Sequence, residues 1–185
     1  MSFIRYYRRN PDGPMDFREA WYEDEVGQLV VNHGHVGHQS KTTGNDDVGP
    51  EDADRMLAAF EQQCTADGYE VIPETEQSRV VAQFALKSTD GTERDRYLER
   101  KAVATITGHF AWRGLGTVEG SEFRPGRLNI NCLSPDPQKA VNALKICLRE
   151  AALDFTKLRI GVAPYDESTG YRLRHPLPVK SPFVL

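Results

Sequence analysis

The chain has 185 residues, of which 39% are hydrophobic and 27% are charged, so it can form one large domain or two small ones with packed cores. No apolar run approaches the roughly 20 residues that cross a bilayer, and the aromatic, charged start of the chain lacks the apolar core of a signal peptide. We therefore expect a cytoplasmic protein that makes no membrane contact. Residues 1–73 contain six Lys/Arg and fourteen Asp/Glu, a net charge of −8, whereas residues 74–185 contain seventeen and thirteen, a net charge of +4.

The first part of the chain predicts three strands. Residues 3–8 are aromatic and β-branched, which is typical of a short strand, and turn residues follow them. Residues 17–23 and 28–35 predict two further strands that pair through the loop 24–27, where a glycine is available for a positive φ. The polar, glycine-containing stretch 39–49 predicts an exposed loop.

A helix is predicted next. Pro50 suits the first turn of a helix, and the acidic residues after it complement the positive end of the helix dipole. The apolar side chains that recur with the spacing of one helical face are Ala53, Met56, Leu57, Phe60 and Cys64. Gly68 is placed to end this helix, and residues 69–73 then predict an extended segment.

Residues 74–78 are polar and have no apolar periodicity, and the sign of the net charge changes around them. They predict a linker between two domains, which we expect to comprise residues 1–73 and 79–185.

The second domain predicts an orderly alternation of strands and helices. Its expected elements are a strand at 80–86, a helix at 92–111, strands at 117–124 and 128–133 joined by a Pro-Gly turn, a helix at 135–153 and a strand at 158–163. The order β-α-β-β-α-β is that of a ferredoxin-like sandwich, in which two helices cover one face of an antiparallel sheet. The tail, residues 172–185, contains three prolines and predicts an extended segment along the surface.

Three of the five histidines, His33, His35 and His38, lie within six residues. On a strand, His33 and His35 point to the same face, which is compatible with metal ligation. No nearby cysteine or carboxylate has the spacing of helical metal ligands, so a polar, exposed hairpin end is the leading interpretation and no metal site is expected. A metal-dependent enzyme that uses the three histidines is the alternative.

Other motifs do not indicate catalysis. The cysteines Cys64, Cys132 and Cys147 are far apart, form no CxxC pair and are expected to be small buried apolar residues. There is no GxSxG or HExxH motif. The segment 114–116, Gly-Leu-Gly, follows a predicted helix, so we expect it to end that helix and not to bind a dinucleotide. The sequence therefore predicts a protein that is not an enzyme, with no catalytic residue and no cofactor.

The segment 17–69 resembles a WGR domain. The resemblance rests on an aromatic strand at 17–22, the run 29–37, an amphipathic helix and the closing residues Gly68-Tyr69. WGR domains are small sheet-plus-helix modules of poly(ADP-ribose) polymerases and several bacterial proteins, so a WGR-like fold is expected for residues 1–73. The family's Trp-Gly-Arg triplet, which supports nucleic-acid contacts, is replaced here by the residues His-Gly-His at 33–35, which argues against nucleic-acid binding.

A second resemblance covers residues 112–162. A Gly-Leu-Gly turn leads into a sheet, an Asn-Ile strand crosses its middle, and an Asp-Pro pair at 136–137 begins the second helix. This pattern is similar to a small α+β module of bacterial proteins of unassigned function, some of which look like toxin-immunity proteins. The resemblance implies an α+β fold more directly than an activity.

Taken together, these features favour a non-enzymatic protein-binding role. An acidic first domain attracts a basic partner, and exposed Trp and Tyr side chains anchor many interfaces. The residues that we expect to bind the partner are Trp21, Tyr22, Glu23, Asp24, Glu25, His33 and His35. The most concrete form is an immunity-type protein that covers the basic cleft of a toxin, and the first alternative is a nucleic-acid-binding accessory protein of the WGR type.

Overall fold

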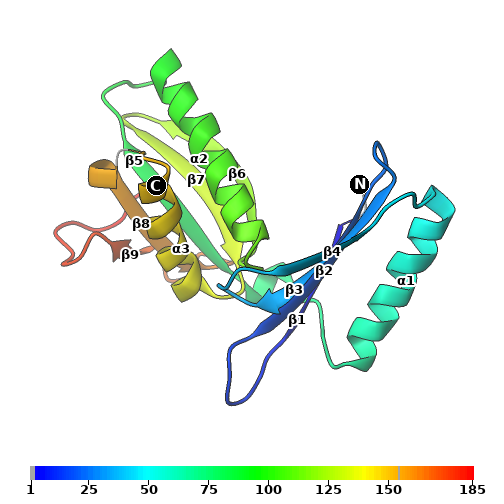
Figure 1. Ribbon diagram of the computed structural model, residues 1–185. Helices are drawn as coiled ribbons and strands as arrows, with labels where there is room; N and C mark the ends of the chain where they lie inside the picture. Colours follow the sequence, from blue (N-terminus) through cyan, green and yellow to red (C-terminus); the bar gives the residue numbers. More distant parts are fainter. Residues whose placement is uncertain (1–2, 154) are drawn as a thin grey trace. The chain divides into compact units, whose positions relative to one another are not determined.

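The computed structural model describes residues 3–153 and 155–185, and these form a mixed α+β structure with three α-helices and two antiparallel sheets (Figure 1). Contacts divide the chain into two compact units. The first unit runs to Ile72 and also includes Trp112–Gly114, and the second comprises Pro73–Ala111 and Leu115–Leu185. Within the described ranges, no helix is long and apolar enough to cross a membrane.

The sheet of the first unit has the strand order β1-β2-β3-β4. Its three predicted strands are confirmed as β1 (Phe3–Arg8), β2 (Asp16–Glu23) and β3 (Gln28–His35). The prediction of a loop over residues 39–49 was wrong in part, because β4 (Lys41–Asn45) pairs with β3 along its whole length. All five residues of β4 are exposed, so this strand has no apolar alternation, and its position is set mainly by backbone pairing with β3.

Helix α1 (Pro50–Ala66) lies along one face of this sheet (Figure 1). The small core between them consists of Ala20 and Leu29 from the sheet and Ala53 and Leu57 from the helix. Gly68 has a φ of +77°, which ends the helix as predicted. The chain then returns to the sheet edge, where the backbones of Tyr7 and Glu70 exchange two hydrogen bonds of 2.8 Å.

A polar row crosses all four strands on the face opposite α1. Arg5 Nε donates to Glu19 Oε2 at 2.6 Å, Asn32 Nδ2 donates to Glu19 Oε1 at 2.9 Å, and Thr42 Oγ1 donates to Asn32 Oδ1 at 2.5 Å. The antiparallel register sets these four residues directly opposite one another. Glu19 is only 1% exposed, so its charge depends on these partners.

The segment after the second helix also belongs to the first unit. Gly37 N donates to Arg113 O at 2.8 Å, and Ser40 N donates to Trp112 O at 2.9 Å. Gly114 has a φ of +58° and packs directly on the ring of Phe17, where a Cβ would lie 2.3 Å from Cγ. Glycine is therefore required at position 114 by both conformation and space.

The second unit contains a sheet with the order β6-β7-β5-β8-β9 in which all neighbours are antiparallel. The four predicted strands are confirmed as β5 (Ser78–Ala85), β6 (Thr117–Arg124), β7 (Arg127–Ser134) and β8 (Leu158–Pro164). The tail begins with β9 (Arg172–His175), which adds an edge strand that the sequence did not predict. Short 3-10 turns occupy Glu74–Glu76, within the expected linker, and Phe155–Lys157.

Helices α2 (Glu93–Ala111) and α3 (Pro137–Glu150) lie side by side on one face of the second sheet (Figure 1). Each begins at a side-chain cap: Asp95 N binds Thr92 Oγ1 at 3.3 Å, and Asp136 Oδ1 accepts from Lys139 N at 3.0 Å. The side chains buried from the sheet and from the two helices form the core, and the largest are Phe84, Ile106, Phe110, Leu128, Ile130, Leu144, Leu148, Leu158 and Ile160.

Candidate functional site

Two loops meet at one end of the first unit. The turn between β2 and β3 lies against the segment that joins β4 to α1, because Val48 N donates to Gly27 O at 2.8 Å. Tyr22 Oη donates to Val48 O at 2.7 Å, and Gln28 Nε2 donates to Asp46 Oδ1 at 2.6 Å. Residues 46–48, far from the hairpin in sequence, are thereby fixed beside it.

This arrangement gathers acidic side chains from the hairpin, the loop and the start of α1. We call this surface the acidic end, and it comprises Glu23, Asp24, Glu25, Asp46, Asp47, Glu51, Asp52 and Asp54. All of them are exposed except Glu23, which is half-buried. The segments 22–28 and 46–56 contain one cation, Arg55, which pairs with Asp52. So dense a set of carboxylates, with so little compensation, creates a strongly negative surface.

Apolar groups accompany these charges. Val26, at the tip of the hairpin, is 65% exposed. A shallow pocket of about 340 Å³ lies at the start of α1, where Val48, Met56 and Ala59 are accompanied by Asp47, Asp52 and Arg55. An apolar centre with a charged rim is the usual composition of a surface that binds another protein.

Trp21 and Tyr22, the aromatic residues expected to bind the partner, are only partly exposed. Both make contacts that hold the hairpin in place. Trp21 is half-buried, and its Nε1 donates to Glu23 Oε1 at 2.9 Å. Tyr22 packs against the core under α1, and burial together with the negative charge of Asp24 raises the pKa of its phenol. Because neighbouring residues of a strand alternate, the two rings lie on opposite faces of the sheet.

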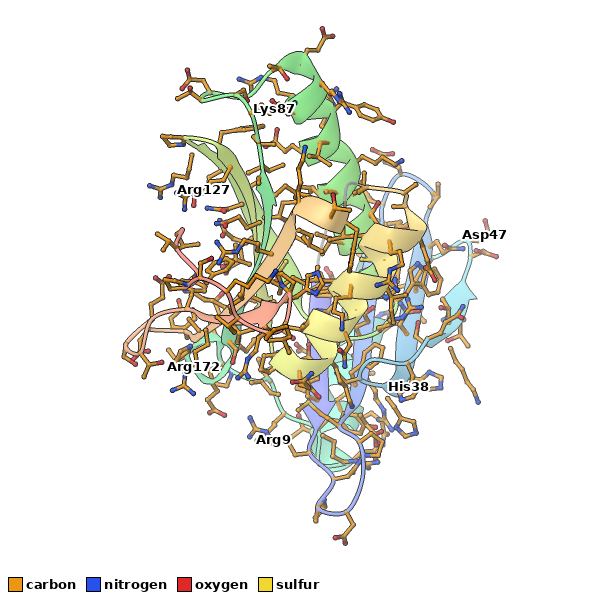
Figure 2. The ribbon with its side chains drawn as sticks, turned by 90° about the vertical axis from the view of Figure 1, so that its left-hand side faces the viewer. Arg9, His38, Asp47, Lys87, Arg127 and Arg172 are labelled. Atoms are coloured by element: carbon orange, nitrogen blue, oxygen red, sulfur yellow. The ribbon has the colours of Figure 1, made fainter. Side chains whose placement is uncertain are left out.

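The histidines lie at the other end of the same strands. In the register of β2 and β3, Glu23 is opposite Gln28 and Asp16 is opposite His35, so the two ends are about 23 Å apart at the usual rise per residue. Asp47 and His38 are labelled at separate places in Figure 2. The seven residues expected to bind the partner therefore form two separate sets, with Trp21 to Glu25 in one and His33 and His35 in the other.

The histidine end is rich in internal hydrogen bonds. Asp16 accepts from Arg8 NH2 at 2.8 Å, from Asn10 Nδ2 at 3.0 Å and from His35 Nδ1 at 2.5 Å. Burial alone would raise the pKa of Asp16, but these hydrogen bonds outweigh it and hold the pKa below its ordinary value. His33 and His38 are exposed, and no group of three or more His, Cys, Asp or Glu in the described ranges could hold a metal ion.

Two arginines complete this end. The guanidinium groups of Arg8 and Arg18 lie 4.8 Å and 4.3 Å from the centre of the Tyr69 ring. Arg18 NH1 also donates to Asp67 Oδ2 at 2.6 Å, and this contact lowers the pKa of Asp67. Arg8 and Arg18 thus pair with Asp16 and Asp67 at the histidine end, whereas Asp24, Glu25 and Asp47 have no ion-pair partner among the described residues.

The cysteines have the buried positions that were predicted. Cys64, Cys132 and Cys147 are all free and buried. Burial raises the pKa of the Cys132 thiol far above its ordinary value, and the proximity of Cys147 adds to this effect. A protonated, inaccessible thiol is a poor nucleophile.

Part of the acidic end was not found from the sequence. Asp46, Asp47 and Val48 lie in the segment 39–49, for which the sequence predicts an exposed loop, and the acidic residues after Pro50 are explained by the helix dipole alone. The pairing of Val48 with Gly27 is a long-range contact that no local pattern signals. The sequence signal that could have revealed the acidic end is the concentration of carboxylates in 23–25 and 46–54, which hold eight of the fourteen in residues 1–73.

Comparisons with protein-family models, curated proteins and solved structures find no match to this chain.

Proposed function

We propose that this chain is a non-enzymatic protein-binding module whose acidic end docks against a basic surface of a protein partner. The observation that carries the proposal is the meeting of two chain segments, 22–28 and 46–56, which gather eight carboxylates and one arginine around exposed apolar groups. Asp24, Glu25 and Asp47 are exposed and form no ion pair with the residues that the structure describes, which favours an outside partner of opposite charge.

The charges and the apolar groups have different roles in this proposal. Long-range attraction by the carboxylates accelerates encounter, by roughly 10- to 1,000-fold for strongly complementary surfaces. Desolvation of Val26 and of the pocket beside Met56 then prolongs the life of the complex. Tyr22, Val48 and Gly27 keep the two loops in a fixed relation, which lowers the entropy cost of binding.

An immunity-type protein is the narrower form of this proposal. A toxin that acts on nucleic acid needs a basic cleft, and an acidic surface can cover such a cleft. Two features of the structure support the WGR-like and ferredoxin-like fold assignments on which the immunity-type proposal rests. The sheet with one helix supports a WGR-like first unit, and the order β6-β7-β5-β8 supports a ferredoxin-like second unit with β9 added at the edge.

The proposal is tested by affinity capture from the native host. The bait is compared with a variant that carries Asp24→Asn, Glu25→Gln and Asp47→Asn. The matched control carries Asp12→Asn, Asp90→Asn and Glu150→Gln, which remove the same charge from exposed positions elsewhere. We expect a basic polypeptide to be retained by the wild type and the control and to be lost from the first variant. Equal retention by all three baits, or retention of partners that are not basic, contradicts the proposal.

Nucleic-acid binding is the second proposal, and the net charge of +4 on residues 74–185 favours it. Lys87, Arg94 and Lys157 line a pocket of about 690 Å³ in the second unit and are the residues to test first. A labelled DNA or RNA should then shift at low salt and be released as salt rises. Absence of a shift at low salt, where electrostatic binding is strongest, excludes it.

A further inference from the structure

The C-terminal tail lies on the face of the second sheet that α2 and α3 do not cover. Val184 O accepts from Gln83 Nε2 at 2.9 Å and from Arg127 NH1 at 2.7 Å. Arg159 NH2 donates to Pro182 O at 2.7 Å and to Ser181 O at 3.1 Å. These three donors come from β5, β7 and β8, so the tail is held across the sheet (Arg127 is labelled in Figure 2).

One aromatic side chain anchors the tail. Phe183 is 6% exposed, although the residues on either side of it are exposed. Its ring fills the space above Gly161, where a Cβ would come within 2.6 Å of the ring. Tyr171 and Arg159 complete this pocket, with the Tyr171 ring centre at 5.7 Å and the Arg159 guanidinium at 5.6 Å from the Phe183 ring centre.

Gln83, one of the three donors, is also held in position by a row of polar side chains on the sheet. Gln83 Nε2 also donates to Asn129 Oδ1 at 2.9 Å, and Asn129 Nδ2 donates to Glu122 Oε1 at 3.1 Å. The strand register sets these three residues in one row. The hydrogen bonds among these three side chains do not involve the tail, so we expect the row to keep its geometry when the tail leaves, and a Gln83 N–H then loses its acceptor.

We infer that this face is a peptide-binding site that the tail occupies, and that it accepts an extended segment from another chain when the tail is displaced. The ligand class is a peptide with an aromatic side chain for the pocket over Gly161 and backbone carbonyls for Gln83, Arg127 and Arg159. Every peptide has such carbonyls, so the aromatic pocket supplies the selectivity. Phe183 is the one buried residue of 172–185, and the hydrogen bonds from Gln83, Arg127 and Arg159 go to backbone carbonyls that any peptide offers, so a segment with an aromatic residue can make the same contacts. This inference does not depend on the role of the acidic end.

The test uses a fluorescent synthetic peptide with the sequence of residues 176–185 and follows its anisotropy against the full chain. The wild-type chain should bind it weakly, because its own tail competes at a high effective concentration. The Phe183→Ala chain loses its anchor but keeps the pocket, so it should bind the peptide roughly tenfold tighter or better. A peptide in which the phenylalanine is replaced by alanine should lose this binding.

Two further variants make the result specific. Adding Gly161→Ala to Phe183→Ala fills the pocket and should abolish peptide binding, whereas adding Gly108→Ala should not, because a Cβ at Gly108 meets no neighbouring atom. A chain that ends at Ser181 opens the same face without any substitution and should behave as Phe183→Ala does. The inference is overturned if these opened chains keep their helical circular dichroism yet bind the peptide no better than the wild type. It is equally overturned if Gly161→Ala leaves the binding unchanged.

Discussion

At the scale of single residues, the first unit uses charge in two ways. Glu19 is buried and has Arg5 and Asn32 as partners, whereas Glu70 and Arg9 form a pair at the surface. The free-energy cost of desolvating a buried carboxylate is offset only by such partners, and removal of one partner leaves a buried charge behind. Glutamate therefore contributes very differently to the free energy of unfolding at positions 19 and 70.

We predict that Glu19→Ala destabilises the protein by roughly 3–5 kcal/mol, because it removes the carboxylate that forms an ion pair with the buried Arg5 guanidinium. Glu70→Ala is the matched control and should cost less than about 1 kcal/mol, since both groups of its pair are about half exposed or more. Urea unfolding of the three proteins measures the difference. Similar losses for the two variants would show that the polar row across the sheet does not matter.

A pH dependence follows from Asp67. Its contact with Arg18 holds its pKa below the ordinary value of 3.8, so the contact stabilises the folded chain above that value and is lost as pH falls through the folded pKa. Asp67→Asn should therefore lower the melting temperature at about pH 5 and make little difference at about pH 2. Thermal melts of the two proteins at both pH values provide the test, and a gap that persists at the lower pH would contradict it.

At the scale of elements, helices were predicted more reliably than edge strands. Helix α1 was found because its apolar residues recur with helical spacing, and the caps of α2 and α3 are local patterns of a few residues. Strand β4 was missed because Lys41–Asn45 is polar and wholly exposed, and its place is set by pairing with β3. The same applies to β9, whose pairing with β8 shifts register between Ile160 and Gly161.

The cap of α3 gives an element-scale prediction. Asp136→Ala removes the acceptor of the Lys139 N–H and should cost about 1 kcal/mol, whereas Asp136→Asn keeps an acceptor and should cost less. The free energy of unfolding of the second unit, measured by denaturant titration, distinguishes the two variants. Equal effects of alanine and asparagine would mean that the hydrogen bond at the start of α3 contributes nothing.

At the scale of the whole molecule, the candidate site depends on how distant segments meet. The sequence indicated an acidic first part and named Glu23, Asp24 and Glu25, but it could not place Asp46 and Asp47 beside them. It also grouped His33 and His35 with the acidic residues, although the register sets them opposite Arg18 and Asp16, toward the other end of the same strands. The net charge of a segment can be counted from the sequence. The position of each charge in the acidic end, however, depends on strand register and on loop packing.

The central claim is that the acidic end binds a basic protein surface, and the association rate constant of the captured partner tests it most directly. For the wild type, this rate constant should fall steeply as ionic strength rises, because salt screens the carboxylates. The variant with Asp24→Asn, Glu25→Gln and Asp47→Asn should associate more slowly at low salt and lose most of the salt dependence, while the control variant with Asp12→Asn, Asp90→Asn and Glu150→Gln should resemble the wild type. A rate constant that is independent of salt, or equal for both variants, would contradict the account.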